Sequence, residues 1–454
     1  MSVMHFAGAD RVVGERCGRR GLPALGRQFL FLQGPHGPFF AMLARALRKD
    51  GASVLKAGLC RADDTEWRGV GPYQPYSGDF AGWRDWLERL VSERQITDIV
   101  LYGDTRPYHA VAVDLARETD LTVHVFEEGY LRPFWVTYER GGSNGNSRLM
   151  DIDLETMSAA TTIEEYEQEE APPHWGAAWR HAYWGLRHHF DVVFRNRAYP
   201  SFREHRPTNA VSELGFYLKR LLVLPLLTPE RRWREKRLLR SGKIYHLVLL
   251  QMAIDASMRD HSDYDSVPEF IEECLKAFAE GAPKDHYIVF KSHPFEDGRE
   301  RLEFQARAMA RDLGLEDRMI FLHGGKLGAL LDRARSAITI NSTAGQQALW
   351  RGLPISVLGQ CVYAKPEFVK QGDLGDFFAG PEAPDATAYR DYRQFLLMSS
   401  QVRGSYYTGP GRRNAVEQIA PKMLDHLDPY DRALQVGAAL EEGANIAHFP
   451  RRAG

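Results

Sequence analysis

The feature that most constrains this sequence is a regular alternation of short apolar runs with segments of helical periodicity. In the first half, apolar runs lie at 29–32, 53–55, 99–102 and 122–126, and helical patterns cover 38–49 and 108–118. Strands that alternate with helices of this length indicate a doubly wound parallel sheet. Ligands of such sheets bind beyond the carboxyl ends of the strands, so the residues after each run are the first candidates for function.

The same alternation returns in the second half of the chain, at 244–250, 287–291, 319–322, 336–340 and 355–358. The sequence therefore predicts an α/β protein with two doubly wound domains. We expect a disordered leader at 1–27, a first domain at 28–200 and basic interdomain helices at 201–243. A second domain at 244–387 and C-terminal helices at 388–454, which pack back across both domains, complete the predicted organisation.

Composition argues against several classes of protein. A length of 454 residues suits two domains, and a formal net charge of −2 gives no case for binding nucleic acid. The four cysteines form no CxxC pair, which argues against a zinc site or a disulfide framework. The longest aliphatic run, 221–227, contains Pro225 and is far shorter than the ~20 residues of a membrane span. Without a signal-peptide pattern at its N-terminus, the sequence predicts a cytoplasmic protein.

Polar loops follow the strands of the second half. A small-residue turn that opens a helix offers backbone N–H groups to an anion, and it is also an ordinary helix cap. Structural roles stay open for single residues, with Lys291 as a strand-end charge and His293 as a histidine beside a proline turn. Because several such loops follow consecutive strands, we predict a nucleotide-sugar site from Gln251, Lys291, His293, Pro294, His323, Asn341, Ser342, Thr343 and Gly345.

A carboxylate pair follows the last predicted strand of the first half. Glu127 and Glu128 stand directly before Gly129, and adjacent residues of an extended chain point in opposite directions, so only one can face a ligand directly. A positioned carboxylate acts as a base toward a hydroxyl or as a nucleophile toward a sugar. The alternative is structural, with both acids paired to Arg106, Arg132 or Arg140.

The other candidates of the first half lie on loops that we assign to the acceptor side of the site. Gln33, Gly34 and His36 form a glycine-rich turn, where small residues let a ligand approach the backbone. Asp104, Arg106 and Arg132 follow later strands. Neither the dinucleotide-binding fingerprint nor the P-loop pattern is present, and no metal-binding motif stands out, so we expect no metal ion and no cofactor.

Five segments in this order resemble the KpsS/LipB-type family of capsule polysaccharide synthesis and export proteins. The resemblance runs from residue 28 to residue 407, and only the segment at 126–133 is distinctive alone. The segments are FLQGPHGPF at 31–39, YGDTRPYH at 102–109, FEEGYLRP at 126–133, KSHP at 291–294 and NSTAG at 341–345.

The resemblance implies a β-Kdo transferase with two Rossmann-like domains facing a cleft, a variant of the GT-B architecture. Such an enzyme would use CMP-β-Kdo with retention of configuration and extend a lyso- or phosphatidylglycerol acceptor. In the related dual-module transferases the loop reads Glu-Asp-Gly, and its second acid is the suspected catalytic group. This correspondence points to Glu128 as nucleophile or base, and to His293, Ser342 and Thr343 as ligands of the phosphate and the Kdo carboxylate.

A lipid acceptor gives meaning to the basic stretch at 231–237, which lies beside the apolar residues 216–227. These residues suit the anionic inner leaflet, with about 1 kcal/mol for each cation, although a solvated basic helix fits equally. We therefore expect a peripheral protein on the cytoplasmic face of the inner membrane, beside other capsule proteins. Two rivals stay open: another GT-B-like enzyme, such as a sialyl or polyol-phosphate transferase, and a non-catalytic export adaptor.

Overall fold

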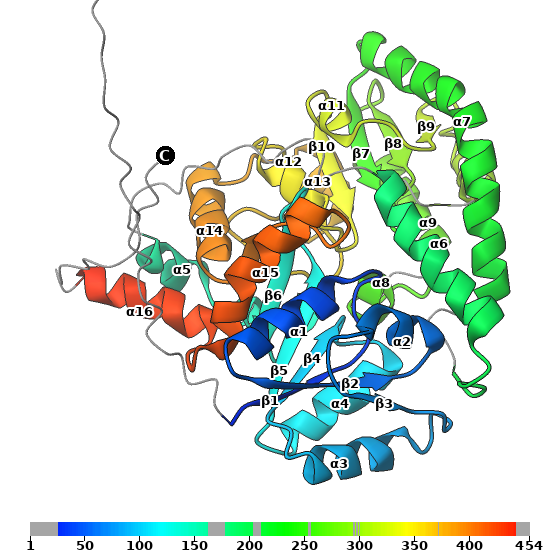
Figure 1. The fold of residues 1–454 in the computed structure, drawn as a ribbon. Coiled ribbons are helices and arrows are strands. Elements are labelled where there is room, and N and C mark those ends of the chain that lie inside the picture. The colour runs from blue at the N-terminus through cyan, green and yellow to red at the C-terminus, as the bar shows by residue number, and fades with distance from the viewer. Residues whose placement is uncertain are drawn as a thin grey trace, which may run out of the picture.

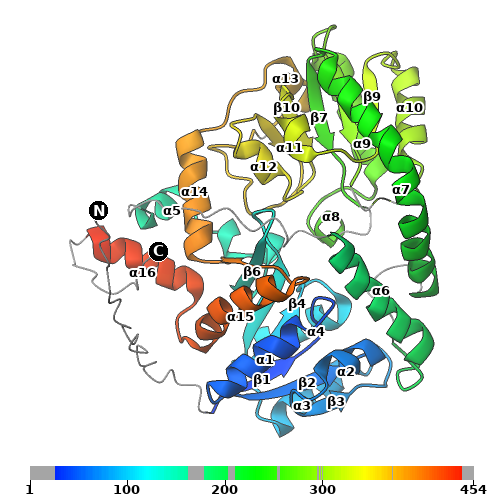
Figure 2. The ribbon, with the colours of Figure 1, turned by 45° about the horizontal axis from the view of Figure 1, so that its top comes forward.

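The computed structural model describes residues 26–161, 178–202, 210–252, 256–293, 296, 298, 300–370 and 372–441. Residues 1–25 of the expected leader and Pro294 lie outside the described residues. Two sheets form the two halves of the molecule, and helices on both flanks connect them (Figures 1 and 2).

The first sheet has seven strands. They are β1 (Gln28–Phe31), β2 (Ser53–Gly58), β3 (Tyr73–Pro75), β4 (Asp98–Tyr102), β5 (Thr122–Glu128), β6 (Trp135–Arg140) and β12 (Gln401–Arg403). Their order is β12-β6-β5-β4-β1-β2-β3. The pairs from β3 to β5 are parallel, whereas β6 is antiparallel to both β5 and β12.

Side chains alternate between the two faces of this sheet, and each face is covered by helices. Phe29 and Phe31 of β1 pack with α1 (Phe39–Lys49) and α15 (Gly409–Leu424) on one face. Leu30 and Leu32 belong to the opposite core, with α3 (Trp83–Glu93) and α4 (Pro107–Arg117). Because both faces are buried, the parallel strands are apolar runs with little polar alternation. The helix α2 (Arg61–Trp67) follows β2.

The second sheet has five parallel strands in the order β11-β10-β7-β8-β9. They are β7 (Tyr245–Leu249), β8 (Tyr287–Lys291), β9 (Met319–Leu322), β10 (Ser336–Thr339) and β11 (Ile355–Val357). One face packs on α9 (Val267–Gly281), α10 (Leu302–Asp312) and α13 (Leu374–Ala379). Short helices accompany the strand ends: α8 (Ala256–Asp260), α11 (Leu327–Leu331) and α12 (Gly345–Leu349).

Further helices connect the two sheets. On one flank, α6 (Ala178–Arg195) and α7 (Ala210–Arg240) lie side by side (Figures 1 and 2). On the other flank lie α5 (Leu154–Ala160), α14 (Ala386–Met398) and α16 (Pro429–Glu441) (Figures 1 and 2). The 3₁₀ turns η1 (Asn144–Asn146) and η2 (Arg148–Met150) precede α5 in the chain. One apolar cluster runs through both halves and contains Leu149, Met157, Leu247 and Tyr430. Lys365 adds a polar connection, because its Nζ lies 2.8 Å from the Leu149 carbonyl.

The predicted fold class is confirmed, with two corrections. The first sheet is mixed rather than wholly parallel, because the chain turns back after Gly129 and β6 pairs antiparallel with β5. The C-terminal region is not wholly helical, because the chain after α14 is extended and forms β12, which pairs with the outer edge of β6. This pairing satisfies backbone groups that an exposed edge of β6 would leave without partners in the sheet.

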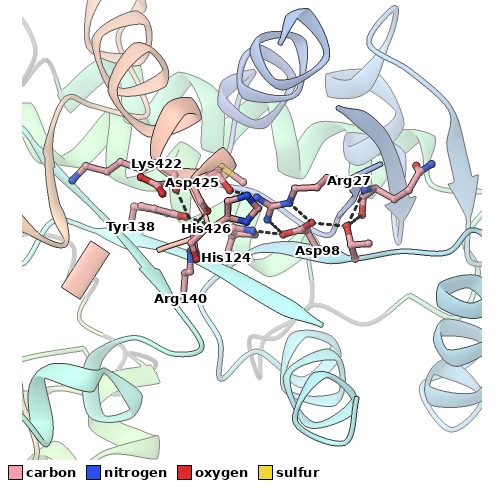
Figure 3. Close-up of polar contacts among 11 residues, drawn as sticks. Arg27, Asp98, His124, Tyr138, Arg140, Lys422, Asp425 and His426 are labelled. Atoms are coloured by element: carbon pink, nitrogen blue, oxygen red, sulfur yellow. Dashed lines mark hydrogen bonds and ion pairs between the residues drawn. The ribbon is translucent and has the colours of Figure 1, made fainter. Parts of the chain in front are cut away.

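At the amino-terminal ends of the parallel strands of the first sheet, a polar cluster binds the C-terminal part of the chain to the strands (Figure 3). Asp98, which is 1% exposed, accepts hydrogen bonds from Arg27 Nε at 3.0 Å and from His124 Nε2 at 2.8 Å. Arg27 also donates to the carbonyl of Met423 at 2.6 Å. Burial would raise the pKa of Asp98, but the bonds from His124 and Arg27 outweigh it and hold the pKa at about 2.

His124 takes part in this cluster as a neutral imidazole. Burial lowers its pKa to about 4, so at neutral pH Nε2–H donates to Asp98 while Nδ1 accepts from the Tyr138 hydroxyl at 2.8 Å. Arg140 extends the cluster to the end of α15, where it donates to the carbonyls of Lys422, Asp425 and His426 (Figure 3).

We expect Asp98→Ala to lower the free energy of unfolding by about 3–5 kcal/mol, because it leaves His124 and the largely buried Arg27 without their carboxylate. Urea-induced unfolding followed by circular dichroism measures the change. Asp114→Ala is the matched control, since Asp114 and its partner Arg117 are 55% and 64% exposed. We expect that control to lose less than about 1 kcal/mol. Equal losses in the two variants would contradict the account of the cluster.

Candidate active site

Each sheet has a point where the order of its strands reverses, and predicted residues lie at both points. In the first sheet this switch point lies between β1 and β4, and in the second it lies between β7 and β10. Ligands of open α/β sheets bind beyond the carboxyl ends of the strands at such points. Gln33 and Asp104 follow β1 and β4, and Gln251 and Asn341 follow β7 and β10.

Glu128 ends β5 and is held by three donors. The Tyr407 hydroxyl donates to Oε1 at 2.7 Å, and the Tyr102 hydroxyl lies 3.4 Å from the same oxygen. Arg132 Nη1 lies 3.2 Å from Oε2. These donors fix the positions of both oxygens of the carboxyl group. With its side chain 26% exposed, Glu128 is oriented by the protein and still partly accessible.

Glu127 lies beside different neighbours, as expected for the adjacent residue of a strand. Its Oε1 accepts a hydrogen bond from the Glu128 amide at 2.9 Å. Its Oε2 lies 3.3 Å from the position that a Cβ on Gly103 would occupy. Burial raises the pKa of Glu127 to about 7, although that hydrogen bond and the charge of Arg106 oppose the effect. A carboxyl group with such a pKa can gain or lose a proton at neutral pH, as a general acid or base must.

The arginines named as structural partners separate into two groups. Arg132 contacts Glu128 directly, and the Arg106 guanidinium lies 4.8 Å from the centre of the Tyr102 ring. Arg140 instead binds carbonyls near the end of α15. The structural alternative therefore holds in part, because Arg132 orients the carboxylate without removing it from solvent.

Asp104 holds a loop together. Its carboxylate accepts hydrogen bonds from the Ser143 amide at 3.0 Å, from Ser143 Oγ at 3.1 Å and from Asn146 Nδ2 at 3.0 Å. It is 4% exposed. These contacts bring the segment at 143–146 to the carboxyl end of β4, and a further role of Asp104 toward an acceptor stays a prediction.

The glycine-rich turn after β1 lies against α2 and α6. Gln33 Nε2 is 3.3 Å from Oδ2 of Asp63, and the ring of His36 stacks on His188 with 4.1 Å between centroids. A Cβ on Gly34 would lie 2.7 Å from the Phe40 ring, so the need for glycine at this position comes from core packing.

Gln251 and Asn341 hold each other across the second switch point. Gln251 Nε2 donates to Asn341 Oδ1 at 2.8 Å, and the backbone N–H of Asn341 donates to Gln251 Oε1 at 3.0 Å. Both residues are 5% exposed. Asn341 Nδ2 also reaches the carbonyl of His261 at 3.1 Å. The pair therefore fixes the loops that follow β7 and β10.

The turn at 341–345 differs from the expected anion cradle. The side chains of Ser342 and Thr343 are half-buried, but the helix that follows, α12, has only 5 residues. A Cβ on Gly345 would lie 2.3 Å from the Tyr363 hydroxyl, so this glycine is required for packing. Most backbone amides of the turn are already bonded, namely those of Asn341, Ser342, Ala344 and Gly345.

The remaining donor-side candidates have different surroundings. Lys291 is 5% exposed, and burial lowers its pKa to about 8 while the charge of Glu235 opposes that effect. His323 Nε2 lies 2.6 Å from Oε2 of Glu303, a contact that lowers the pKa of Glu303 to about 2. His323 is thus paired with α10. His293 is half-buried, and its carbonyl accepts from the Glu296 amide at 3.0 Å.

Two residues of the site escaped the sequence analysis. Tyr407, which binds Glu128, comes 279 residues later in the chain, and only a tyrosine pair at 406–407 marks the position. His261 joins the loops of the two sheets: its carbonyl accepts from Asn341, and its Nδ1 lies 2.4 Å from the position of a Cβ on Gly145. His261 stands in a polar turn that gives no sequence signal of its own. The carboxyl-end loops of both sheets therefore meet at this histidine.

We expect Gly145→Ala to displace His261 and to lower the free energy of unfolding by about 1–3 kcal/mol, as overpacking does in a dense contact. Chemical denaturation of the purified variant measures this loss. Gly380→Ala serves as the control, because a Cβ at Gly380 meets nothing within 4 Å and its φ is −148°. A Gly145→Ala protein as stable as this control would argue against a tight contact between the two loops.

Comparisons with known proteins identify the family. A solved β-Kdo 2,7 transferase, KpsC of Thermosulfurimonas dismutans, aligns with a TM-score of 0.43 and 14% identity over 88% of this chain and 99% of that chain. LipB, the capsule polysaccharide modification protein of Neisseria meningitidis serogroup B, is 32% identical over 84% of this chain and 91% of its own length. KpsS, the capsule polysaccharide export protein of Escherichia coli, is 30% identical over 84% of this chain and 97% of its own length. Residues 97–407 match the family described as capsule polysaccharide biosynthesis protein, and this chain is a member of that family.

Proposed function

We propose that this protein is a retaining β-Kdo transferase, which moves Kdo from CMP-Kdo to a lyso- or phosphatidylglycerol acceptor and so begins a capsule linker. The observation that carries the proposal is the meeting of the two switch-point regions at His261, with Glu127 and Glu128 on β5 of the first sheet. A transferase must hold its donor and its acceptor side by side. Each of the two doubly wound sheets offers one ligand-binding region at its switch point, so the two sheets together can hold both substrates. Membership of the capsule family supports the same conclusion.

The second domain supplies groups that suit an unusually anionic donor. CMP-Kdo carries a phosphate and a sugar carboxylate, which cations and hydroxyl donors bind well. In this proposal Lys291 provides positive charge, His293 provides a ring N–H donor, and Ser342 and Thr343 provide hydroxyl groups. Gln251 and Asn341 orient their loops through the two hydrogen bonds between them. The proposal needs no metal ion and no cofactor.

The first domain supplies the carboxylates. The carboxyl group of Glu128 lies at the anomeric carbon of Kdo, and Tyr407 and Arg132 hold its oxygens. A carboxylate in that position either attacks the sugar or stabilises positive charge on it. Glu127, with a pKa of about 7, takes the proton of the acceptor hydroxyl. In this proposal both acids, which are the last two residues of β5, reach the reacting groups, which departs from the expectation that only one of them faces a ligand directly. This division of roles makes each acid separately testable.

The acceptor places the protein on the cytoplasmic face of the inner membrane. Across the part of the chain that the structure describes, no helix is both long and apolar enough to cross a bilayer. The helix α7 exposes Trp233 and Leu226, at 58% and 77%, together with the basic residues Arg232, Lys236 and Arg237. Cations near an anionic leaflet contribute about 1 kcal/mol each, so this segment suits a membrane surface.

Capsule assembly in living cells separates the transferase from a non-catalytic export adaptor. A strain without this protein is supplied with the variant carrying both Glu128→Gln and His293→Ala, and immunoblotting shows that the variant is made. We expect no capsule at the cell surface. Normal capsule would favour the adaptor.

Competition among CMP-Kdo, CMP-sialic acid and CDP-polyols in a transfer assay separates the proposed donor from those of related enzymes. Transfer from a donor other than CMP-Kdo would overturn the proposal.

A further inference from the structure

The helix α6 exposes a stripe of aromatic residues. Tyr183, Phe190 and Phe194 are 51%, 50% and 60% exposed. Their spacings of seven and four residues place them on one face of the helix. The rings of Phe190 and Phe194 contact each other, with 5.0 Å between centroids, and both stay half exposed. An exposed run of large aromatic side chains on one helix face is typical of a surface that contacts a partner or a membrane.

The charges beside this stripe are positive. Arg187 and Arg197 are exposed, and the Arg195 side chain is 47% exposed. Asp191, the acidic residue of α6, is 5% exposed and bound to Arg195 at 3.0 Å. Aromatic residues flanked by arginines match the boundary of an anionic bilayer, where rings enter the interface and guanidinium groups meet phosphates.

A second face of α6 contacts the site around Glu128. The rings of His181 and Tyr407 lie 4.4 Å apart, and Trp184 Nε1 donates to the Tyr407 carbonyl at 3.3 Å. Tyr407 in turn donates to Glu128. One turn further along, His188 stacks on His36. Because a helix with its side chains is about 10 Å across, Tyr183 lies about one helix width from the residues that hold Glu128. Phe190 and Phe194 extend the stripe further along the axis, by about 1.5 Å for each residue.

We propose that α6 docks on an anionic phospholipid bilayer through Tyr183, Phe190 and Phe194, and that this orientation brings the headgroup of an acceptor lipid to Glu128. The docking step stands on the exposed stripe and its arginines alone. The presentation of the headgroup rests on the proposed transferase function. Figure 2 shows α6 at the side of the molecule, running between the first sheet and α7.

Vesicle flotation of the full-length protein tests the docking step. The probes are vesicles of phosphatidylglycerol mixed with phosphatidylcholine, and vesicles of phosphatidylcholine alone. We expect the variant with both Phe190→Ser and Phe194→Ser to bind the anionic vesicles at least about tenfold more weakly than the wild type. Phe304→Ser, which changes a 72% exposed phenylalanine on α10, is the control and should bind as the wild type does. We expect weak binding to the neutral vesicles in every case.

Two results would overturn the docking step. One is unchanged binding of the double variant to anionic vesicles. The other is a change from dimer to monomer in sedimentation with vesicle binding unaltered, because the stripe would then be covered by a second copy of the chain. Circular dichroism and the urea midpoint check that the double variant is folded, which is expected because both side chains lie mostly on the surface.

A second readout separates this inference from the proposed function. Transfer to a short-chain, water-dispersed lyso-phosphatidylglycerol should survive in the double variant, whereas transfer to phosphatidylglycerol in vesicles should fall with binding. Glu128→Gln should bind vesicles as the wild type does and transfer to neither acceptor. If neither the wild type nor any variant transfers Kdo, but the double variant loses vesicle binding, the transferase proposal fails and the docking step stands. Equal loss of transfer to both acceptors in the double variant would overturn the presentation of the headgroup.

Discussion

Glu128→Gln should reduce the rate of Kdo transfer by about 10³-fold or more while the protein stays folded. The substitution keeps the shape of the side chain and an oxygen for the Tyr407 hydroxyl, but it removes the negative charge. In the proposed mechanism that charge is needed at the anomeric carbon, so the loss should fall on kcat more than on KM. Initial rates of CMP release and of product formation measure the effect.

Two controls make this result specific. Tyr407→Phe removes the donor at 2.7 Å from Glu128 Oε1 and leaves the carboxylate, so we expect a loss of about tenfold. The urea midpoint of Glu128→Gln should match that of the wild type. Retention of more than a tenth of wild-type activity in Glu128→Gln would show that another group performs the catalytic step.

Glu127→Gln should lower kcat/KM by about 10²-fold and change its dependence on pH. A base must be ionised to accept a proton, and burial raises the pKa of Glu127 to about 7. For the wild type we therefore expect kcat/KM to rise with pH through about 7 and to level above it. In Glu127→Gln this bend should disappear. A rate that falls with rising pH through the same range would instead identify Glu127 as an acid.

Glu139 provides the matched control for the pH profile. Burial also raises its pKa to about 7, and it accepts hydrogen bonds from the hydroxyls of Tyr130 and Tyr430 at 2.5 and 2.8 Å. Glu139 belongs to β6, is 0% exposed and contacts Tyr430 of α16. Glu139→Gln should leave the bend near pH 7 in place. Loss of the bend in this variant would show that Glu139, and not Glu127, gives the bend near pH 7.

Both raised pKa values also affect stability. A carboxyl group that is protonated more readily in the folded state than in the unfolded state stabilises the fold at low pH, below the ordinary carboxyl pKa. That contribution is lost as the pH rises to about 7. The pH profile of kcat/KM must therefore be measured where every variant is folded.

The sequence predicted the strand-end loops well because buried parallel strands are apolar runs with sharp ends. The run at 99–102 matches β4 to within one residue, whereas β5 continues two residues past the predicted run at 122–126 and includes Glu127 and Glu128. β3, β6 and β12 were missed, since β3 and β12 have 3 residues each and β6 mixes charged, aromatic and aliphatic side chains. Short or mixed segments become strands through their partners, and a single sequence does not contain that information.

The candidate site shows the same limit. Glu127 and Glu128 could be predicted because a strand, two acids and a glycine follow one another directly. Tyr407 and His261 could not be predicted. Tyr407 is brought to Glu128 only because β12 pairs with β6 just before it in the chain, and His261 joins loops from two different sheets. The packing roles of Gly34 and Gly345 were also hidden, because a glycine required by a neighbouring ring looks the same in sequence as one required by a ligand.

The most direct test of the central claim is the mass of the product formed from CMP-Kdo, generated in situ, and a fluorescent lyso-phosphatidylglycerol. We predict that the wild-type protein adds the mass of one Kdo residue and that Glu128→Gln, folded to the same extent, adds none. No gain of mass with the wild-type protein, when the donor is shown to be intact and the protein folded, would contradict the claim that this chain is a Kdo transferase.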